Sequence, residues 1–174
     1  MKIGIIGVGS ITLGLAHRAV ASGHQVLINN PRGNILVRES VEKIGANAEL
    51  VSIGEAALSD IIIVFFARQD LQGIIELLPD MKGKTILHTN NAFFCLESLP
   101  ELYTDPRSSD ALADLLPSAH IIRLYNTLKA NPALPEQQAC KIFFEGQDKN
   151  AKKKAKAFLE TLSLSALDLG EMLN

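Results

Sequence analysis

The feature that most constrains the fold is a short apolar run that leads through two glycines into a helical pattern. The run covers Lys2 to Ile6 and is typical of a buried strand, and Gly7-Val8-Gly9-Ser10 follows it directly. The segment from Ile11 to Ser22 carries apolar residues at helical spacing, and Gly23 stands where a helix would end. A strand, a glycine loop and a helix in this order predict the first unit of an α/β fold that binds a dinucleotide.

Strand-like and helix-like segments continue to alternate along the chain. We expect further strands at 25–28, 60–66, 84–88, 120–124, 141–144 and 164–169, and helices at 35–44, 54–58, 71–78, 108–116 and 148–162. Such alternation implies parallel strands joined by right-handed crossovers. A length of 174 residues suits one domain. The sequence therefore predicts a single dinucleotide-binding Rossmann domain over residues 1–174, with a doubly wound and mostly parallel sheet.

Composition narrows the classes of partner. The formal net charge is −2, so the chain as a whole does not attract nucleic acid or an anionic membrane surface. It contains no apolar run of about 18 residues that could span a membrane. The two cysteines, Cys95 and Cys140, lack the spacing of a metal site or a redox pair. We expect a cytoplasmic protein with no metal, no nucleic acid and no membrane partner.

The glycine loop supplies the candidate phosphate site. Gly7 suits the tight turn, and Gly9 allows the backbone to approach a pyrophosphate. The amides of Ser10 and Ile11 would then point out of a helix N-terminus, where the helix dipole favours an anion. Thr12 stands where the fingerprint has its third glycine. The alternative interpretation is a turn with a structural role alone.

The end of the second strand indicates which dinucleotide binds. An NAD site usually places an acidic residue there to hold the ribose 2′-hydroxyl, whereas this chain has Asn30 and Arg32. An arginine can hold a 2′-phosphate by charge-assisted hydrogen bonds, which predicts NADP as the cofactor. The alternative is that Arg32 is an ordinary exposed loop residue.

Further candidate site residues follow the later strands, where ligands gather in an open α/β sheet. They are Phe66, Ala67 and Arg68 after the apolar run Ile61–Val64, His88 and Asn91 at the strand that begins at Lys84, and Arg123, Tyr125, Asn126 and Thr127 at the strand that begins at His120, and most of them are polar. Ordinary loop capping would explain the same residues. No acid–base pair has a recognisable signature, so the catalytic residues stay unassigned. That pattern suits hydride transfer between two carriers. A small carbonyl substrate would need a proton donor, for which only His88 or Tyr125 is suitably placed.

Several segments together resemble the NADP oxidoreductases that depend on coenzyme F420. They are Gly7-Val8-Gly9-Ser10, Asn30-Pro31-Arg32-Gly33, Met81-Lys82-Gly83-Lys84, Asn91 and the run from Ile121 to Leu128. The resemblance implies a Rossmann domain with NADP along the glycine loop and a deazaflavin against the nicotinamide. It also implies NADP contacts for Ser10, Ile11, Asn30, Arg32, Ala67 and Asn91, with Asn126 and Thr127 towards the second substrate.

These observations lead to one principal functional hypothesis and one alternative. The principal hypothesis is an NADP(H)-dependent oxidoreductase that transfers hydride between the nicotinamide and a flavin, a deazaflavin such as coenzyme F420, or a small substrate. Phe66, Ala67, Asn91 and Asn126 would line the crevice at the nicotinamide, and Arg68, His88, Asn126 and Thr127 would face the substrate. The alternative is an NADP-binding sensor or regulatory module without turnover. A homodimer is expected from the resemblance.

Overall fold

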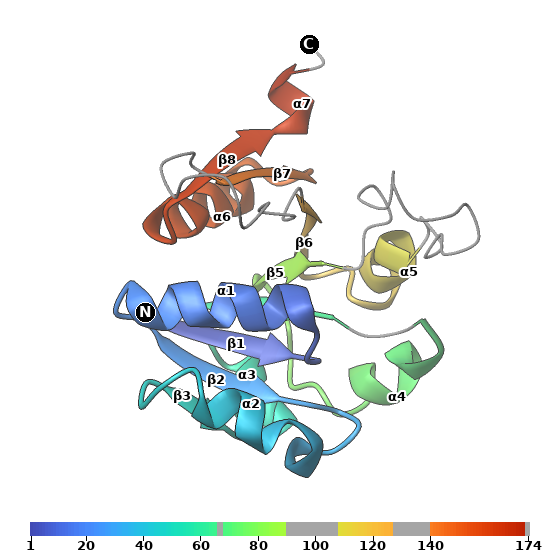
Figure 1. Ribbon diagram of the computed structural model, residues 1–174. Helices are drawn as coiled ribbons and strands as arrows, with labels where there is room; N and C mark the ends of the chain where they lie inside the picture. The colour runs from blue at the N-terminus through green and yellow to red at the C-terminus, as the bar shows by residue number, and fades with distance from the viewer. Residues whose placement is uncertain (66–67, 90–107, 127–139, 173–174) are drawn as a thin grey trace, which may run out of the picture.

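The computed structural model describes residues 1–65, 68–89, 108–126 and 140–172. They form an eight-stranded sheet in the order β3-β2-β1-β4-β5-β6-β7-β8, with helices on both faces (Figure 1). The strands are β1 (Lys2–Ile6), β2 (Gln25–Asn29), β3 (Ala48–Leu50), β4 (Ile61–Val64), β5 (Thr85–His88), β6 (His120–Asn126), β7 (Cys140–Gly146) and β8 (Leu164–Asp168).

The helices follow the strands as the alternating sequence pattern predicts. They are α1 (Ser10–Ala21), α2 (Arg38–Glu42), α3 (Ile53–Ala57), α4 (Leu71–Ile75), α5 (Ser108–Leu115), α6 (Lys149–Thr161) and α7 (Leu169–Met172), with 3₁₀ turns η1 (Asn34–Val37) and η2 (Arg68–Asp70). The helix expected over 35–44 is thus divided into η1 and α2. The helix expected over 71–78 is shorter in the structure, where α4 ends at Ile75.

The sheet is parallel from β3 to β6 and reverses at β7. β7 pairs with β6 in antiparallel register, with Arg123 opposite Glu145 and Asn126 opposite Ile142, and β8 runs parallel to β7. These two strands lie at the far end of the sheet from β3 (Figure 1). The expected doubly wound, mostly parallel sheet is confirmed. The order from β3 to β6 is that of a Rossmann fold, which binds its ligand where the strand order reverses, beside β1.

Two apolar clusters cover the two faces of the sheet. One joins α1, α2 and α6 to the sheet through buried side chains such as Leu15, Val41 and Phe158. The other joins α3, α4 and α5 through side chains such as Ala56, Ile74 and Leu112. Strands covered on both faces are apolar throughout, as Ile61 to Val64 illustrates with four buried residues. This packing fixes the carboxyl ends of β1, β2, β4, β5 and β6 at one edge of the sheet.

Candidate cofactor and substrate site

The glycine loop after β1 has no room for side chains at its two glycines. Gly7 has a φ of +90°, and a Cβ there would lie 1.6 Å from the carbonyl oxygen of Phe65. A Cβ at Gly9 would lie 2.7 Å from the ring of the same phenylalanine. Phe65 follows β4, and its amide donates to the carbonyl of Ile6 in β1. The close approach of these two strand ends explains why both positions are glycine.

Thr12 completes the glycine loop from inside the helix. Its side chain is buried, and its hydroxyl oxygen accepts a hydrogen bond from the amide of Gly9 at 2.9 Å. The same hydroxyl lies 3.1 Å from the carbonyl oxygen of Gly9 and 3.3 Å from that of Gly7, to which it can donate. The residue in place of the third glycine therefore closes the loop and satisfies the Gly9 amide.

The amides of Ser10 and Ile11 begin α1, and within the described residues neither has a hydrogen-bond acceptor. The first turn of α1 contains no acidic residue, and Ser10 is exposed. Donors of this kind at the positive end of a helix dipole attract anions. The structure thus brings together the glycine turn and the two amides that the sequence singled out.

The loop after β2 is held by its own asparagines. The amide of Asn30 donates to the side-chain carbonyl of Asn34 at 2.8 Å, and the Asn30 side chain donates to the carbonyl of Gly33 at 3.1 Å. Asn34 in turn donates to the carbonyl of Val51 at 2.9 Å. These bonds present Arg32 at the tip of a braced loop, where its side chain is 63% exposed.

Arg32 makes an ion pair that its sequence position does not suggest. Its Nη2 and Nε donate to the same carboxylate oxygen of Asp70, at 2.8 Å and 3.2 Å. Asp70 ends η2, on the connection after β4. Because β1 lies between β2 and β4, the pair reaches from one neighbour of β1 to the other at the edge where the glycine loop begins.

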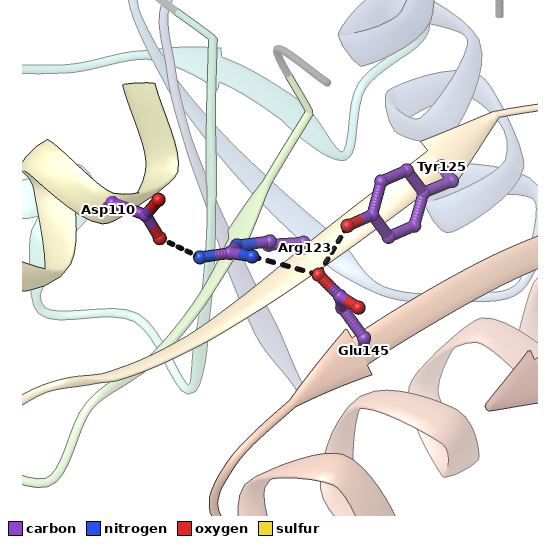
Figure 2. Close-up of polar contacts among 4 residues, drawn as sticks. All are labelled: Asp110, Arg123, Tyr125 and Glu145. Atoms are coloured by element: carbon purple, nitrogen blue, oxygen red, sulfur yellow. Dashed lines mark hydrogen bonds and ion pairs between the residues drawn. The ribbon is translucent and has the colours of Figure 1, made fainter. Parts of the chain in front are cut away.

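A second polar group lies where β6 pairs with β7, and Figure 2 shows its four members. Arg123 lies between two carboxylates and donates to Glu145 at 2.9 Å and to Asp110 of α5. The hydroxyl of Tyr125 donates to the same oxygen of Glu145. The group therefore ties α5, β6 and β7 together on the sheet face that α5 covers.

The pKa values in this group follow from burial and charge. Burial, the hydrogen bond to Glu145 and the charge of Glu145 together raise the pKa of Tyr125 to about 12. Burial acts to lower the pKa of Arg123, but the hydrogen bond to Glu145 and the charges of Asp110 and Glu145 outweigh it and raise that pKa. At neutral pH, Tyr125 therefore keeps its proton and Arg123 its charge.

His88 ends β5 and pairs in register with Arg123 of β6. Its side chain is buried, with 1% of the residue exposed. The hydroxyl of the neighbouring Thr89 donates to the carbonyl of Val64 at 3.0 Å, which holds the end of β5 against β4.

The remaining predicted site residues are described in part or not at all. The backbone places Arg68 at the start of η2 and Asn126 at the end of β6. Phe66, Ala67, Asn91 and Thr127 lie outside the described residues.

Sequence reasoning missed the acidic partners of this edge. Asp70 and Glu145 both follow or end a strand, but they lie 38 and 22 residues from the arginines they bind. No local sequence signal indicates these pairs, because each forms between residues that only the folded sheet brings together.

The described part of the chain contains no set of three or more His, Cys, Asp or Glu side chains arranged to hold a metal ion. Within the same residues, every helix is too short or too polar to cross a membrane.

Comparison with known proteins places the chain among reductases. Residues 2–92, just over half of the chain, match the model of a family described as NADP oxidoreductase, coenzyme F420-dependent. The metalloreductase STEAP3 of Rattus norvegicus is 23% identical over 175 residues, which cover 98% of this chain. This chain spans about a third, 34%, of the length of that curated relative.

Solved structures show the same fold. A protein from Arthrobacter sp. FB24 assigned as an F420-dependent NADP reductase superposes with a TM-score of 0.71 at 18% identity, over 97% of this chain and 84% of that one. An imine reductase from Aspergillus terreus, solved in complex with NADPH4 and dibenz[c,e]azepine, superposes with a TM-score of 0.69 at 21% identity, over 97% of this chain and 54% of that one. At these identities the superpositions establish the Rossmann-type fold.

Proposed function

The chain belongs to the family of coenzyme F420-dependent NADP oxidoreductases, and from this premise we propose that it binds NADP(H) and transfers hydride between the nicotinamide and a second substrate. That substrate is a flavin, a deazaflavin such as coenzyme F420, or a small carbonyl or imine compound. The observation that carries the proposal is the glycine loop, whose two glycines have no room for a Cβ and whose next two amides have no acceptor within the described residues.

The glycine loop fits the pyrophosphate of a dinucleotide. Gly7 and Gly9 keep the backbone bare beside Phe65, and Ser10 and Ile11 offer their amides to the phosphate oxygens. The amide of Gly9 is already bonded to Thr12, so it takes no part in this contact. The amide of Gly9 thus stabilises the loop itself, and the amides of Ser10 and Ile11 are the ones that can bind the ligand.

The loop after β2 fits the phosphorylated ribose. Asn30 is fixed by bonds to Gly33 and Asn34, and the neighbouring Arg32 is exposed and positively charged. Within residues 25–34 the chain has no acidic side chain that would repel a 2′-phosphate. We therefore assign the 2′-phosphate of NADP to Arg32, with Asn30 beside it.

The second substrate lies towards the ends of β5 and β6 in this proposal. NADP(H), when bound, supplies or accepts the hydride there. We expect the second substrate to be oriented by the later part of β6, where Arg123 and Tyr125 both form hydrogen bonds to Glu145. His88 is buried and the Tyr125 hydroxyl is directed to Glu145, so neither offers a proton readily. This arrangement supports transfer between two carriers over reduction of a small carbonyl. We further propose that the protein works in the cytoplasm as a homodimer.

Calorimetric titration with NADPH and NADH tests the cofactor assignment. We expect NADPH to bind more tightly, and Arg32→Ala to weaken NADPH binding about ten-fold or more while leaving NADH nearly unchanged, since a charge-assisted hydrogen bond contributes roughly 1.5–3 kcal/mol. Arg38→Ala is the matched control, because it removes an exposed arginine of the next helix. Equal weakening of both dinucleotides by Arg32→Ala would contradict the assignment.

Turnover tests the second half of the proposal. We expect oxidation of NADPH in the presence of coenzyme F420 or a flavin, followed by its absorbance at 340 nm, and slower oxidation with a cyclic imine. Tight NADPH binding without turnover on any acceptor would support the sensor or regulatory module instead.

A further inference from the structure

We propose that Asp70 sets the cofactor preference of the site by competing with the 2′-phosphate of NADP for Arg32. The inference rests on the proposed function, because it assumes that Arg32 is the residue that holds this phosphate. It adds a residue that determines specificity on a strand connection that carries no part of the dinucleotide fingerprint.

The geometry of the ion pair supports competition. Two donors of Arg32, Nε and Nη2, are directed to one oxygen of Asp70 at 3.2 Å and 2.8 Å. Those donors form the side of the guanidinium fork that binds a phosphate with two parallel hydrogen bonds. A phosphate that binds through Nε and Nη2 needs the same donors, so it competes with the Asp70 carboxylate for them.

The energy of the pair allows such an exchange. The side chain of Arg32 is 63% exposed and that of Asp70 is 33% exposed, so water and salt screen their attraction. A 2′-phosphate carries more negative charge than a carboxylate and would displace it. NADH has no group that competes, so the Arg32–Asp70 pair remains intact when NADH binds.

The first experiment compares Asp70→Asn with the wild type by calorimetry. Asparagine has nearly the shape of aspartate but carries no charge, so the substitution removes the competition and keeps the size of the side chain. We expect NADPH and 2′,5′-ADP to bind about three- to five-fold more tightly, and NADH to be unchanged. Glu76→Gln is the matched control, since it removes one negative charge from the exposed residue that follows α4.

A double-mutant cycle separates competition from simple repulsion. If Asp70 acts through Arg32, Asp70→Asn has no effect on NADPH binding in the Arg32→Ala background. If Asp70→Asn still tightens NADPH binding in the Arg32→Ala background, or if Glu76→Gln tightens it equally, the proposed competition is overturned.

The inference and the proposed function fail in different ways. Asp70→Asn without effect on NADPH, together with strong weakening by Arg32→Ala, refutes the role of Asp70 alone. Wild-type protein that binds NADPH no better than NADH, with no effect of Arg32→Ala, refutes the assignment of the 2′-phosphate and the inference with it.

Discussion

At the scale of single residues, the glycine loop shows how one side chain can replace a feature of the fingerprint. The fingerprint uses a third glycine for close packing of helix and strand. Thr12 stands there, is buried, and uses its hydroxyl to hold Gly9 and the turn before it. The sequence identified the departure from the pattern but did not indicate the hydrogen bonds by which the new side chain holds the loop.

We expect Thr12→Val to lower the free energy of unfolding by about 1–3 kcal/mol, because it keeps the shape of the side chain and leaves the amide of Gly9 without its acceptor. Chemical denaturation followed by circular dichroism measures the change. Thr12→Ser keeps the hydroxyl, so its free energy of unfolding should fall by less than that of Thr12→Val. Equal losses for the two variants would show that the methyl group, and not the hydroxyl, matters.

Gly9 and Gly14 provide a matched pair in the same part of the chain. A Cβ at Gly9 would meet the Phe65 ring at 2.7 Å, whereas a Cβ at Gly14 in α1 meets nothing within 4 Å. Gly9→Ala should weaken NADPH binding at least ten-fold, because the ring or the loop must move. Gly14→Ala should leave binding unchanged and add about 0.5–1 kcal/mol of stability, since alanine favours a helix over glycine. Calorimetry and denaturation measure both effects.

At the scale of elements, the sequence predicts a strand or helix well where its own residues carry a strong periodic pattern. The strand Lys2–Ile6 and the helix of α6 carry strong patterns, and the structure places both within a residue or two of the expected ranges. β3 was not predicted, because Ala48–Leu50 is only three residues long and lies at the sheet edge. The reversal at β7 was not predicted either, since strand direction depends on pairing with β6 and not on the residues of β7 itself.

The residues of the candidate site divide in the same way, into those that a local pattern predicts and those that only the folded sheet brings together. Gly7, Gly9, Ser10 and Ile11 could be predicted, because one strand–loop–helix unit contains them all. Asp70 and Glu145 could not, because each finds its arginine only after the sheet has formed. Pairing between distant strand ends is a property of the sheet order, which a single sequence without its register does not specify.

The contact between β6 and β7 makes a prediction about ionisation. Burial raises the pKa of Tyr125, and the hydrogen bond to Glu145 and the negative charge of Glu145 raise it further, to about 12. Glu145→Gln should therefore lower this pKa. At pH 11 we expect more phenolate absorbance at 295 nm in Glu145→Gln than in the wild type, with circular dichroism to confirm that both remain folded.

Tyr125→Phe is the reference for that titration, because it removes the phenol under study. A variant Glu145→Gln whose spectrum at pH 11 matches the wild type would show that burial alone accounts for the raised pKa.

At the scale of the whole molecule, the turn after α1 is tied to the end of α6. His24 Nε2 lies 2.8 Å from the hydroxyl oxygen of Thr161, and the side chains of Arg18 and Ser22 donate to the carbonyls of Leu162 and Thr161. These contacts join residues more than a hundred positions apart. They hold the first and last helices of the same face of the sheet against each other.

The buried His24 makes the stability of the protein depend on pH. Burial, followed by the positive charge of the N-terminus, lowers the pKa of His24 below 6.5. The unfolded chain therefore takes up a proton at a higher pH than the folded one, so stability is full above about pH 6.5 and falls as pH drops below it. Denaturation at pH 7.5 and pH 5.5 measures the loss. His24→Gln should reduce this difference, and a difference of the same size in that variant would contradict the role of His24.

The reversal of β7 also affects how such a protein can change during evolution. Asn126 ends β6 opposite Ile142, so the chain leaves the sheet and re-enters it at neighbouring points of the edge that carries the site. Residues exchanged on β7 and β8 would change the far end of the sheet without altering the register of β1, β2 and β4. The strands beside the glycine loop can in this way stay constant while the other end of the sheet diversifies.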